Sequence, residues 1–103
     1  MGRREALQAI LGYVGLPPTH VDVFRIIIEN PGITRTEIAE QLNETTNGIN
    51  YALNQLKFAN LIKITKEEKR NGRGRKNYKY YPNREKLEEI KEELVAALKD
   101  LKL

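Results

Sequence analysis

The 103-residue chain contains no cysteine, a single histidine and only two aspartates, which lie far apart in the sequence. Without cysteine it has no disulfide framework, no thiolate metal cluster and no thiol redox sensor. One histidine and two separated aspartates do not supply the grouped acids, bases and nucleophiles that an enzyme site needs. We therefore expect a non-enzymatic intracellular protein with no cofactor and no metal site.

Long apolar runs are also missing from the chain. No run approaches the roughly 20 residues that cross a bilayer, and residues 1–4 lead into an amphipathic pattern rather than a signal peptide. Hydrophobic residues still make up 40% of the sequence, which is enough to argue against wholesale disorder. The length fits one small domain, residues 1–103, for which we expect no membrane contact and no small-molecule ligand.

Positive charge is concentrated in one segment, residues 63–83. This segment has eight basic and two acidic residues, a local balance of +6, whereas the whole chain carries +4. A phosphate backbone attracts such a concentrated field, because neutralising it releases condensed counterions. Nucleic acid is therefore the first partner to expect. The basic residues are Lys63, Lys66, Lys69, Arg70, Arg73, Arg75, Lys76 and Lys79.

Helical periodicity marks two segments near the N-terminus. Apolar residues at i, i+3, i+4 and i+7 predict an amphipathic helix over residues 3–14. A second helix is expected over residues 19–29, where Thr19 and Asp22 resemble a capping box. Its wide apolar arc predicts a central position in the domain. His20 is expected to be an exposed residue at the start of this helix.

Two further helices with their own capping residues follow in residues 34–59. Thr34 and Glu37 form a capping-box pattern for a short helix, and Thr45 is an N-cap for a longer one. Asn60 tolerates the left-handed conformation that ends the longer helix. A short and a long helix joined by a tight connection are typical of a helix-turn-helix, which reads the DNA major groove.

A β-hairpin is expected next, over residues 61–82. Two runs rich in β-branched and aromatic residues flank the turn signal Asn71-Gly72. Tyr78 and Tyr80 alternate onto one face of the second run, and we expect them to pack on the body of the domain rather than stack on bases. The basic segment is thus predicted to form this hairpin.

The last periodic segment, residues 84–102, has apolar residues at alternating spacings of three and four. This heptad pattern predicts a helix that dimerises as a coiled coil, packed against residues 3–14. The alternative is that the same residues form part of the intramolecular core. The seam residues are Leu87, Ile90, Leu94, Ala97, Leu98 and Leu101.

The sequences TRTEIAEQLNETTNGINYALNQLKFANLI and GRGRKNYKYY resemble winged helix-turn-helix regulators of the MarR, ArsR and TrmB-like kind, and suggest an archaeal member. The resemblance covers residues 18–81. It implies a mainly α fold with a small β-hairpin wing, flanked by N- and C-terminal helices that dimerise. The chain lacks the cysteine or histidine clusters of ArsR-like metal sensors and the sugar-binding domain common in TrmB-like proteins, so no effector is implied.

Candidate DNA contacts fall on the longer helix of the helix-turn-helix and on the wing. Asparagine pairs with adenine and threonine methyls contact thymine, whereas arginine, which grips guanine, is absent from the helix face. The recognition-helix candidates are Thr46, Asn47, Asn50, Tyr51, Asn54 and Lys57. The wing candidates, expected to hold backbone or minor groove, are Lys69, Arg70, Arg73, Arg75 and Lys76.

These patterns predict a homodimeric transcription regulator that binds double-stranded DNA in the cytoplasm, associated with the nucleoid. One alternative is an architectural chromatin protein with little sequence preference. Another is a winged-helix adaptor that contacts proteins and no nucleic acid. The simplest competing explanations for the two candidate surfaces are a solvated helix face and a lysine-protected sheet edge.

Overall fold

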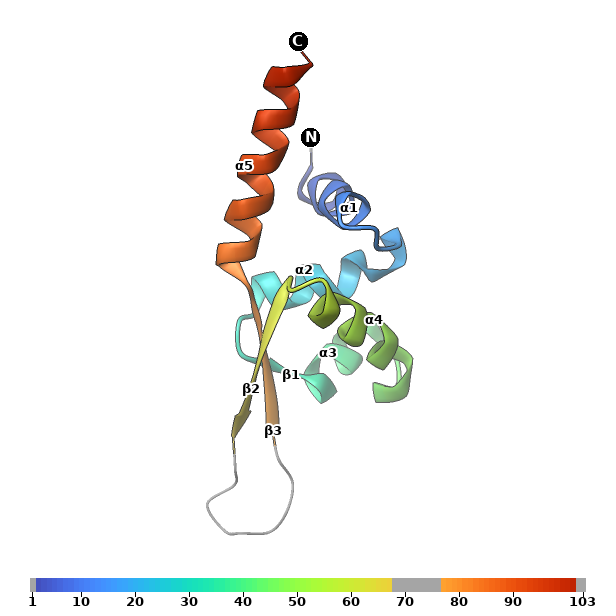
Figure 1. Cartoon of the computed structure of the whole chain (residues 1–103). Coiled ribbons are helices and arrows are strands. Elements are labelled where there is room, and N and C mark those ends of the chain that lie inside the picture. Colours follow the sequence, from blue (N-terminus) through green and yellow to red (C-terminus); the bar gives the residue numbers. More distant parts are fainter. Residues whose placement is uncertain (1, 68–76, 102–103) are drawn as a thin grey trace.

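The computed structural model of the chain describes residues 2–67 and 77–101. It is mostly helical with one small antiparallel sheet, as expected for a winged helix (Figure 1). The elements in chain order are α1 (Arg3–Tyr13), the 3-10 helix η1 (Pro18–His20), α2 (Val21–Glu29), β1 (Ile33–Thr34), α3 (Arg35–Leu42), α4 (Thr46–Phe58), β2 (Ile62–Glu67), β3 (Asn77–Pro82) and α5 (Arg84–Asp100).

The sheet has three strands in the order β1-β3-β2. The hairpin strands pair so that Ile64 lies opposite Tyr80, and Ile33 of β1 lies opposite the same tyrosine on its other side. Strand β1 was not predicted, because two residues show no periodicity and this strand exists only through its pairing with β3. Gly32, just before it, has φ 90° and donates its N–H to the Tyr80 carbonyl at 2.8 Å.

Helix α2 lies at the centre of the domain, as its wide apolar arc predicted. Phe24 and Ile27 are fully buried, and Val23 and Ile26 on neighbouring faces are nearly so. A helix that is apolar on more than one side is stable only when other elements cover it, and here α1, α3, α4 and β3 all contact it. One continuous core therefore joins both terminal helices to the helix-turn-helix.

The caps of α3 and α4 agree with the sequence prediction. Thr34 accepts the Glu37 backbone N–H at 3.3 Å while the Glu37 carboxylate accepts the Thr34 N–H at 3.1 Å, a complete capping box. Thr45 accepts the Gly48 N–H at 3.0 Å. Asn60 follows α4 with φ 60°, in the left-handed region.

The predicted capping box at Thr19 is wrong. Thr19 lies inside η1, and α2 begins after His20, with no side-chain hydrogen bond at its N-cap. The physical reason lies in Pro17 and Pro18: proline favours the first position of a helical turn, so the turn begins before Thr19 and leaves it within the turn.

Asn83 joins three elements at the base of the hairpin. Its side chain caps α5 by accepting the Lys86 N–H at 3.3 Å, and its amide nitrogen donates to the Asn60 carbonyl at 2.9 Å. Its backbone N–H donates to the carbonyl of Leu61, also at 2.9 Å. These bonds fix α5 relative to the end of α4, so α5 and the hairpin extend from opposite ends of the body (Figure 1). None of the described helices is long and apolar enough to cross a membrane.

Candidate nucleic-acid interface

Helix α4 has one buried face and one polar face. Ile49, Ala52, Leu53 and Leu56 are buried in the core. Because these residues fix the rotation of the helix, the opposite face points to solvent. All six recognition-helix candidates therefore retain exposed surface: Asn50 is half-buried, and the exposed residues are Thr46, Asn47, Tyr51, Asn54 and Lys57.

Phe58 is a prominent surface residue of this face that the sequence analysis did not select. Its side chain is 85% exposed at the end of α4, one heptad after Tyr51, which is 63% exposed. Residues seven apart on a helix lie on nearly the same line. The outer line of α4 thus alternates asparagine with aromatic residues: Asn47, Tyr51, Asn54 and Phe58. The signal in the sequence that could have identified Phe58 is its spacing, because it lies off the apolar stripe formed by Ile49, Ala52, Leu53 and Leu56.

The hairpin strands extend away from α4, with Lys63 and Lys66 exposed on β2. The wing candidates Lys69, Arg70, Arg73, Arg75 and Lys76 lie outside the described residues. Of the two tyrosines expected to pack on the body, Tyr80 is 2% exposed and belongs to the core, whereas Tyr78 is 38% exposed. Tyr78 is therefore partly exposed to solvent, and it lies beside the polar face of α4.

A cleft lies between α4 and the hairpin. Asn50, Asn54 and Lys57 form its α4 side, and Tyr78 forms part of its hairpin side. Arg35, the first residue of α3, also lines it, although the sequence analysis did not select this residue. The cleft thus brings together three of the six recognition-helix candidates, including the cation Lys57, with a second cation, Arg35.

Arg35 is held in this cleft by the sheet. Its Nη2 donates to the Tyr80 hydroxyl at 3.5 Å, and its Nε is buried with no hydrogen-bond partner among the described residues. A guanidinium presents several donors in one plane and suits phosphate, so the cleft has the chemistry of a phosphate contact.

His20 is buried, which corrects the expectation of an exposed residue. Its side chain is 5% exposed, and its ring lies edge-on to the ring of Tyr51, with centroids 5.4 Å apart. Burial lowers the pKa of His20, because removing water disfavours the charged imidazolium. The reason for the difference is tertiary: α4 passes over the start of α2, which no local pattern reveals. Tyr51 therefore packs on His20 as well as facing solvent.

The apolar seam of α5 is divided between the core and the surface. Ile90 is 1% exposed, and Leu87 and Leu94 pack at the edge of the same core. Leu98 and Leu101 are 54% and 66% exposed, and Ala97 is exposed as well. The Tyr13 hydroxyl of α1 donates to the Glu93 carboxylate of α5 at 2.7 Å, which joins the two terminal helices. The first half of the seam thus follows the intramolecular alternative, and the second half has no partner in the described chain.

No group of three or more metal-ligating side chains gathers anywhere in residues 2–67 or 77–101. The arrangement around α4 offers amide, hydroxyl and cationic donors on one surface, which is the chemistry of a nucleic-acid contact.

Comparison with known proteins places this geometry in a family. The chain has a fold similar to the crystal structure of the transcriptional regulator SlyA, with 19% identity, a TM-score of 0.51, and coverage of 91% of this chain and 71% of that one. Comparison with curated protein sequences finds no significant match. The TFIIE alpha subunit family matches residues 5–103. These findings confirm the winged-helix class and do not support the narrower MarR, ArsR or TrmB-like type. The chain belongs to the TFIIE alpha subunit family.

Proposed function

We propose that this protein binds duplex DNA as a transcription regulator, with α4 in the major groove and the wing on the adjacent backbone. The observation that carries the proposal is the cleft in which Arg35 and Lys57 lie beside Asn50 and Asn54. Base-reading amides next to phosphate-binding cations are what a groove-reading helix requires, because the cations set its register on the duplex. Membership of a transcription-factor family supports the same role.

Each group has a separate task in this proposal. Asn50 and Asn54 read base edges, with adenine as the favoured partner of an amide. Lys57 and Arg35 hold phosphates on the side of α4 that faces the hairpin. Arg73 and Arg75 of the wing contact the flanking backbone or a narrow minor groove, which adds affinity without choosing the sequence.

A homodimer formed through the distal part of α5 would present two copies of α4. The exposed apolar residues Val95, Leu98 and Leu101 support this arrangement, since a helix hides such a stripe by pairing with another. Two recognition helices would then enter successive major grooves at half-sites about 10 base pairs apart, or a small multiple of that distance.

Random-sequence duplex selection followed by titration of the enriched and unrelated duplexes tests this function. We expect Asn50→Ala and Asn54→Ala to change the preference among duplexes, and Arg73→Ala with Arg75→Ala to weaken binding on all of them and flatten the salt dependence. A uniform loss from the asparagine variants, or equal salt slopes for the arginine variant and the parent, would contradict the assigned roles.

Arg35→Gln extends the test to the residue that the structure adds. Removing one phosphate contact should weaken every duplex similarly and lower the salt slope by about one. Arg84→Gln is the matched control, because it removes the same charge from the exposed start of α5, beyond the cleft. Equal effects of the two substitutions would show that Arg35 acts only through overall charge.

A second candidate function is a protein contact through the outer line of α4. The exposed aromatic rings of Tyr51 and Phe58 favour it, because aromatic residues are enriched at protein interfaces. In that case no duplex would be retained at low salt. Phe58→Ser should then abolish partner binding, whereas under the DNA-binding function it should leave the sequence preference of the protein unchanged.

A further inference from the structure

Asn47 and Gly48 form an asparagine-glycine peptide in the first turn of α4. Both residues are exposed, and the Asn47 side chain makes no hydrogen bond among the described residues, so its carboxamide is free to rotate. An asparagine followed by glycine is especially prone to deamidation, because glycine has no side chain to shield its nitrogen from the carboxamide. The same pair of residues occurs once more in the sequence, at Asn71-Gly72.

Deamidation of this peptide requires only water and a base dissolved in it. The Gly48 backbone nitrogen loses its proton to the base and attacks Asn47 Cγ, and the side-chain nitrogen takes up a proton and leaves as ammonia. Water then opens the resulting succinimide ring at either of its carbonyls, which leaves aspartate or isoaspartate. Water reaches this peptide, because Gly48 lines a second cleft of about 430 Å³ on the side of α4 away from the hairpin.

The Thr45 cap holds the nitrogen that must attack. The Gly48 N–H donates to both the Thr45 hydroxyl and the Thr45 carbonyl, each at 3.0 Å. Both bonds must break before the nitrogen loses its proton, and the backbone at Asn47 must leave the helical conformation for the ring to close. A Cβ at position 48 would lie 3.2 Å from the Thr45 hydroxyl oxygen, so the glycine that favours the attack also gives the cap its room.

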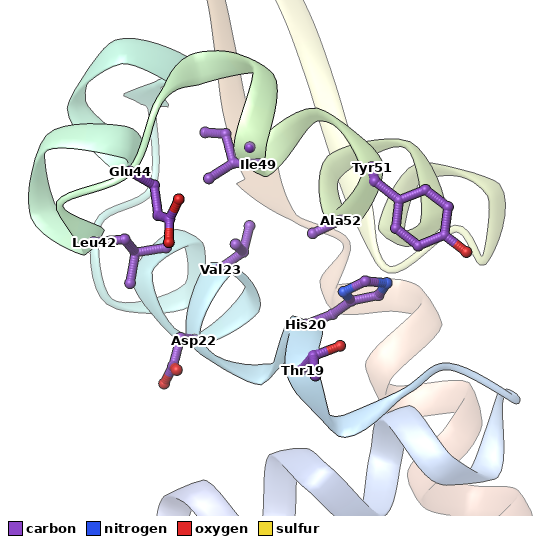
Figure 2. Close-up of a pocket in the computed structure, with 10 residues that line it drawn as sticks. Thr19, His20, Asp22, Val23, Leu42, Glu44, Ile49, Tyr51 and Ala52 are labelled. Atoms are coloured by element: carbon purple, nitrogen blue, oxygen red, sulfur yellow. The ribbon is translucent and has the colours of Figure 1, made fainter.

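Opening of this first turn is a local event. Ile49 is 2% exposed, and Figure 2 shows it on the side of α4 that faces Val23 of α2. The core therefore holds the helix from Ile49 onward, whereas residues 45–48 are all exposed. Segments without buried side chains open with free energies well below that of global unfolding. The first turn of α4 can thus open while the rest of the domain stays folded.

We propose that Asn47 is a deamidation site whose rate is set by opening of the Thr45 cap, and that its products oppose DNA binding by α4. Aspartate adds a negative charge to a helix face that approaches phosphates, and isoaspartate lengthens the backbone within the first turn. Both products therefore disturb the contacts assigned to Asn50 and Asn54. The loss of DNA binding rests on the proposed function, whereas the deamidation does not.

Peptide mapping by mass spectrometry of the full chain, incubated at mildly alkaline pH, tests the site. It measures aspartate and isoaspartate at position 47 over time, and we expect slower conversion in the folded chain than in urea. Thr45→Ala should raise the rate in the folded chain about fivefold, the change in open population that corresponds to about 1 kcal/mol of capping free energy. Thr45→Ser, which retains the hydroxyl, should keep the slow rate. Asn71 in the same digest is the internal reference.

Two variants separate opening of the cap from other effects. Asn83→Ala removes the cap of α5, so it lowers overall stability without altering the first turn of α4, and it should leave the Asn47 rate unchanged. Thr36→Ala removes an exposed threonine from α3 and should also leave that rate unchanged. Equal acceleration by Thr45→Ala and Asn83→Ala would overturn the proposal. So would a folded Thr45→Ala variant that does not convert while the chain in urea does.

The effect on DNA binding has its own measurement. Asn47→Asp has the same side chain as one product and should weaken binding to every duplex about fivefold, the effect of one close like-charge pair in water. Asn47→Ala removes the same amide without adding a charge, so it should weaken binding less. Equal losses in the two variants would overturn the effect of the charge. A parent protein that binds no duplex would overturn the proposed function, and the conversion rates at Asn47 would still decide the deamidation site.

Discussion

Asparagine performs two different structural tasks at three positions of this chain. Asn43 and Asn60 adopt φ values of 54° and 60°, and they are the only non-glycine residues with positive φ in the described segments. The short amide side chain makes asparagine the residue that best tolerates this region after glycine. Asn83 instead caps α5 and bonds to Asn60. One residue type therefore ends α3 and α4 and begins α5.

The neutral, buried His20 links the stability of the protein to pH. Burial places the pKa of His20 in the folded chain below its value of about 6.5 in the unfolded chain. Below pH 6.5 the unfolded chain therefore binds more protons, and the free energy of unfolding falls as the pH decreases toward the folded pKa. The contribution of His20 is fully present above the unfolded pKa.

Urea unfolding at pH 7.5 and pH 5.5 measures this effect. We expect the free energy of unfolding of the parent protein to fall more between these values than that of His20→Phe. Carboxylates such as Glu37, whose pKa is lowered by hydrogen bonds from Thr34, titrate in both proteins and cancel in the comparison. An identical pH dependence of the two proteins would show that His20 does not titrate differently on folding.

At the scale of elements, α4 depends on a capping residue for its N-terminal turn. The Thr45 hydroxyl accepts the Gly48 N–H, one of the four N–H groups that a helix start leaves without an internal partner. We expect Thr45→Ala to lower the free energy of unfolding by about 1 kcal/mol. Denaturant unfolding at neutral pH gives this difference.

Thr36→Ala is the matched control for the cap. Thr36 is exposed in the first turn of α3, and alanine is the better helix former. This substitution should therefore leave stability unchanged or raise it slightly. A loss of similar size in both variants would mean that the Thr45 hydrogen bond contributes nothing beyond the common cost of removing a threonine.

For the whole molecule, the main structural prediction concerns assembly through α5. Leu98→Glu places a charge in the exposed apolar stripe, where pairing of two helices would bury it at high cost. We expect this substitution to shift the protein from dimer to monomer in sedimentation equilibrium without lowering its helix content. A monomeric parent protein would contradict the proposed dimer.

Ala96→Glu provides the control for this prediction. Ala96 is also exposed on α5, but it lies on the face opposite Leu98. The substitution introduces the same charge into the same helix, so it should leave the dimer intact. Dissociation by both variants would indicate a general effect of negative charge rather than a seam at Leu98.

Much of the fold could be predicted from local patterns in the sequence. The capping box of Thr34 and Glu37, the N-cap Thr45 and the left-handed Asn60 agree with the structure, because each depends on residues within a few positions. The apolar stripe of α4 also agrees with the structure, because it too depends on short spacings in the sequence. This stripe determines which face of α4 is exposed. Local periodicity thus determined the helices and the orientation of the candidate recognition helix.

Other features were decided only by the tertiary structure. Strand β1 depends on β3, more than 40 residues away, and Arg35 meets Lys57 only because α3, α4 and the hairpin share one corner. His20 is buried because α4 passes over it, and the seam of α5 divides where the core ends, between Leu94 and Leu98.

The absence of cysteine, the amphipathic helices and the basic segment followed from the sequence, since composition and short spacings determine them. The two clefts beside α4 followed from packing, because each joins side chains from elements that are distant in the chain.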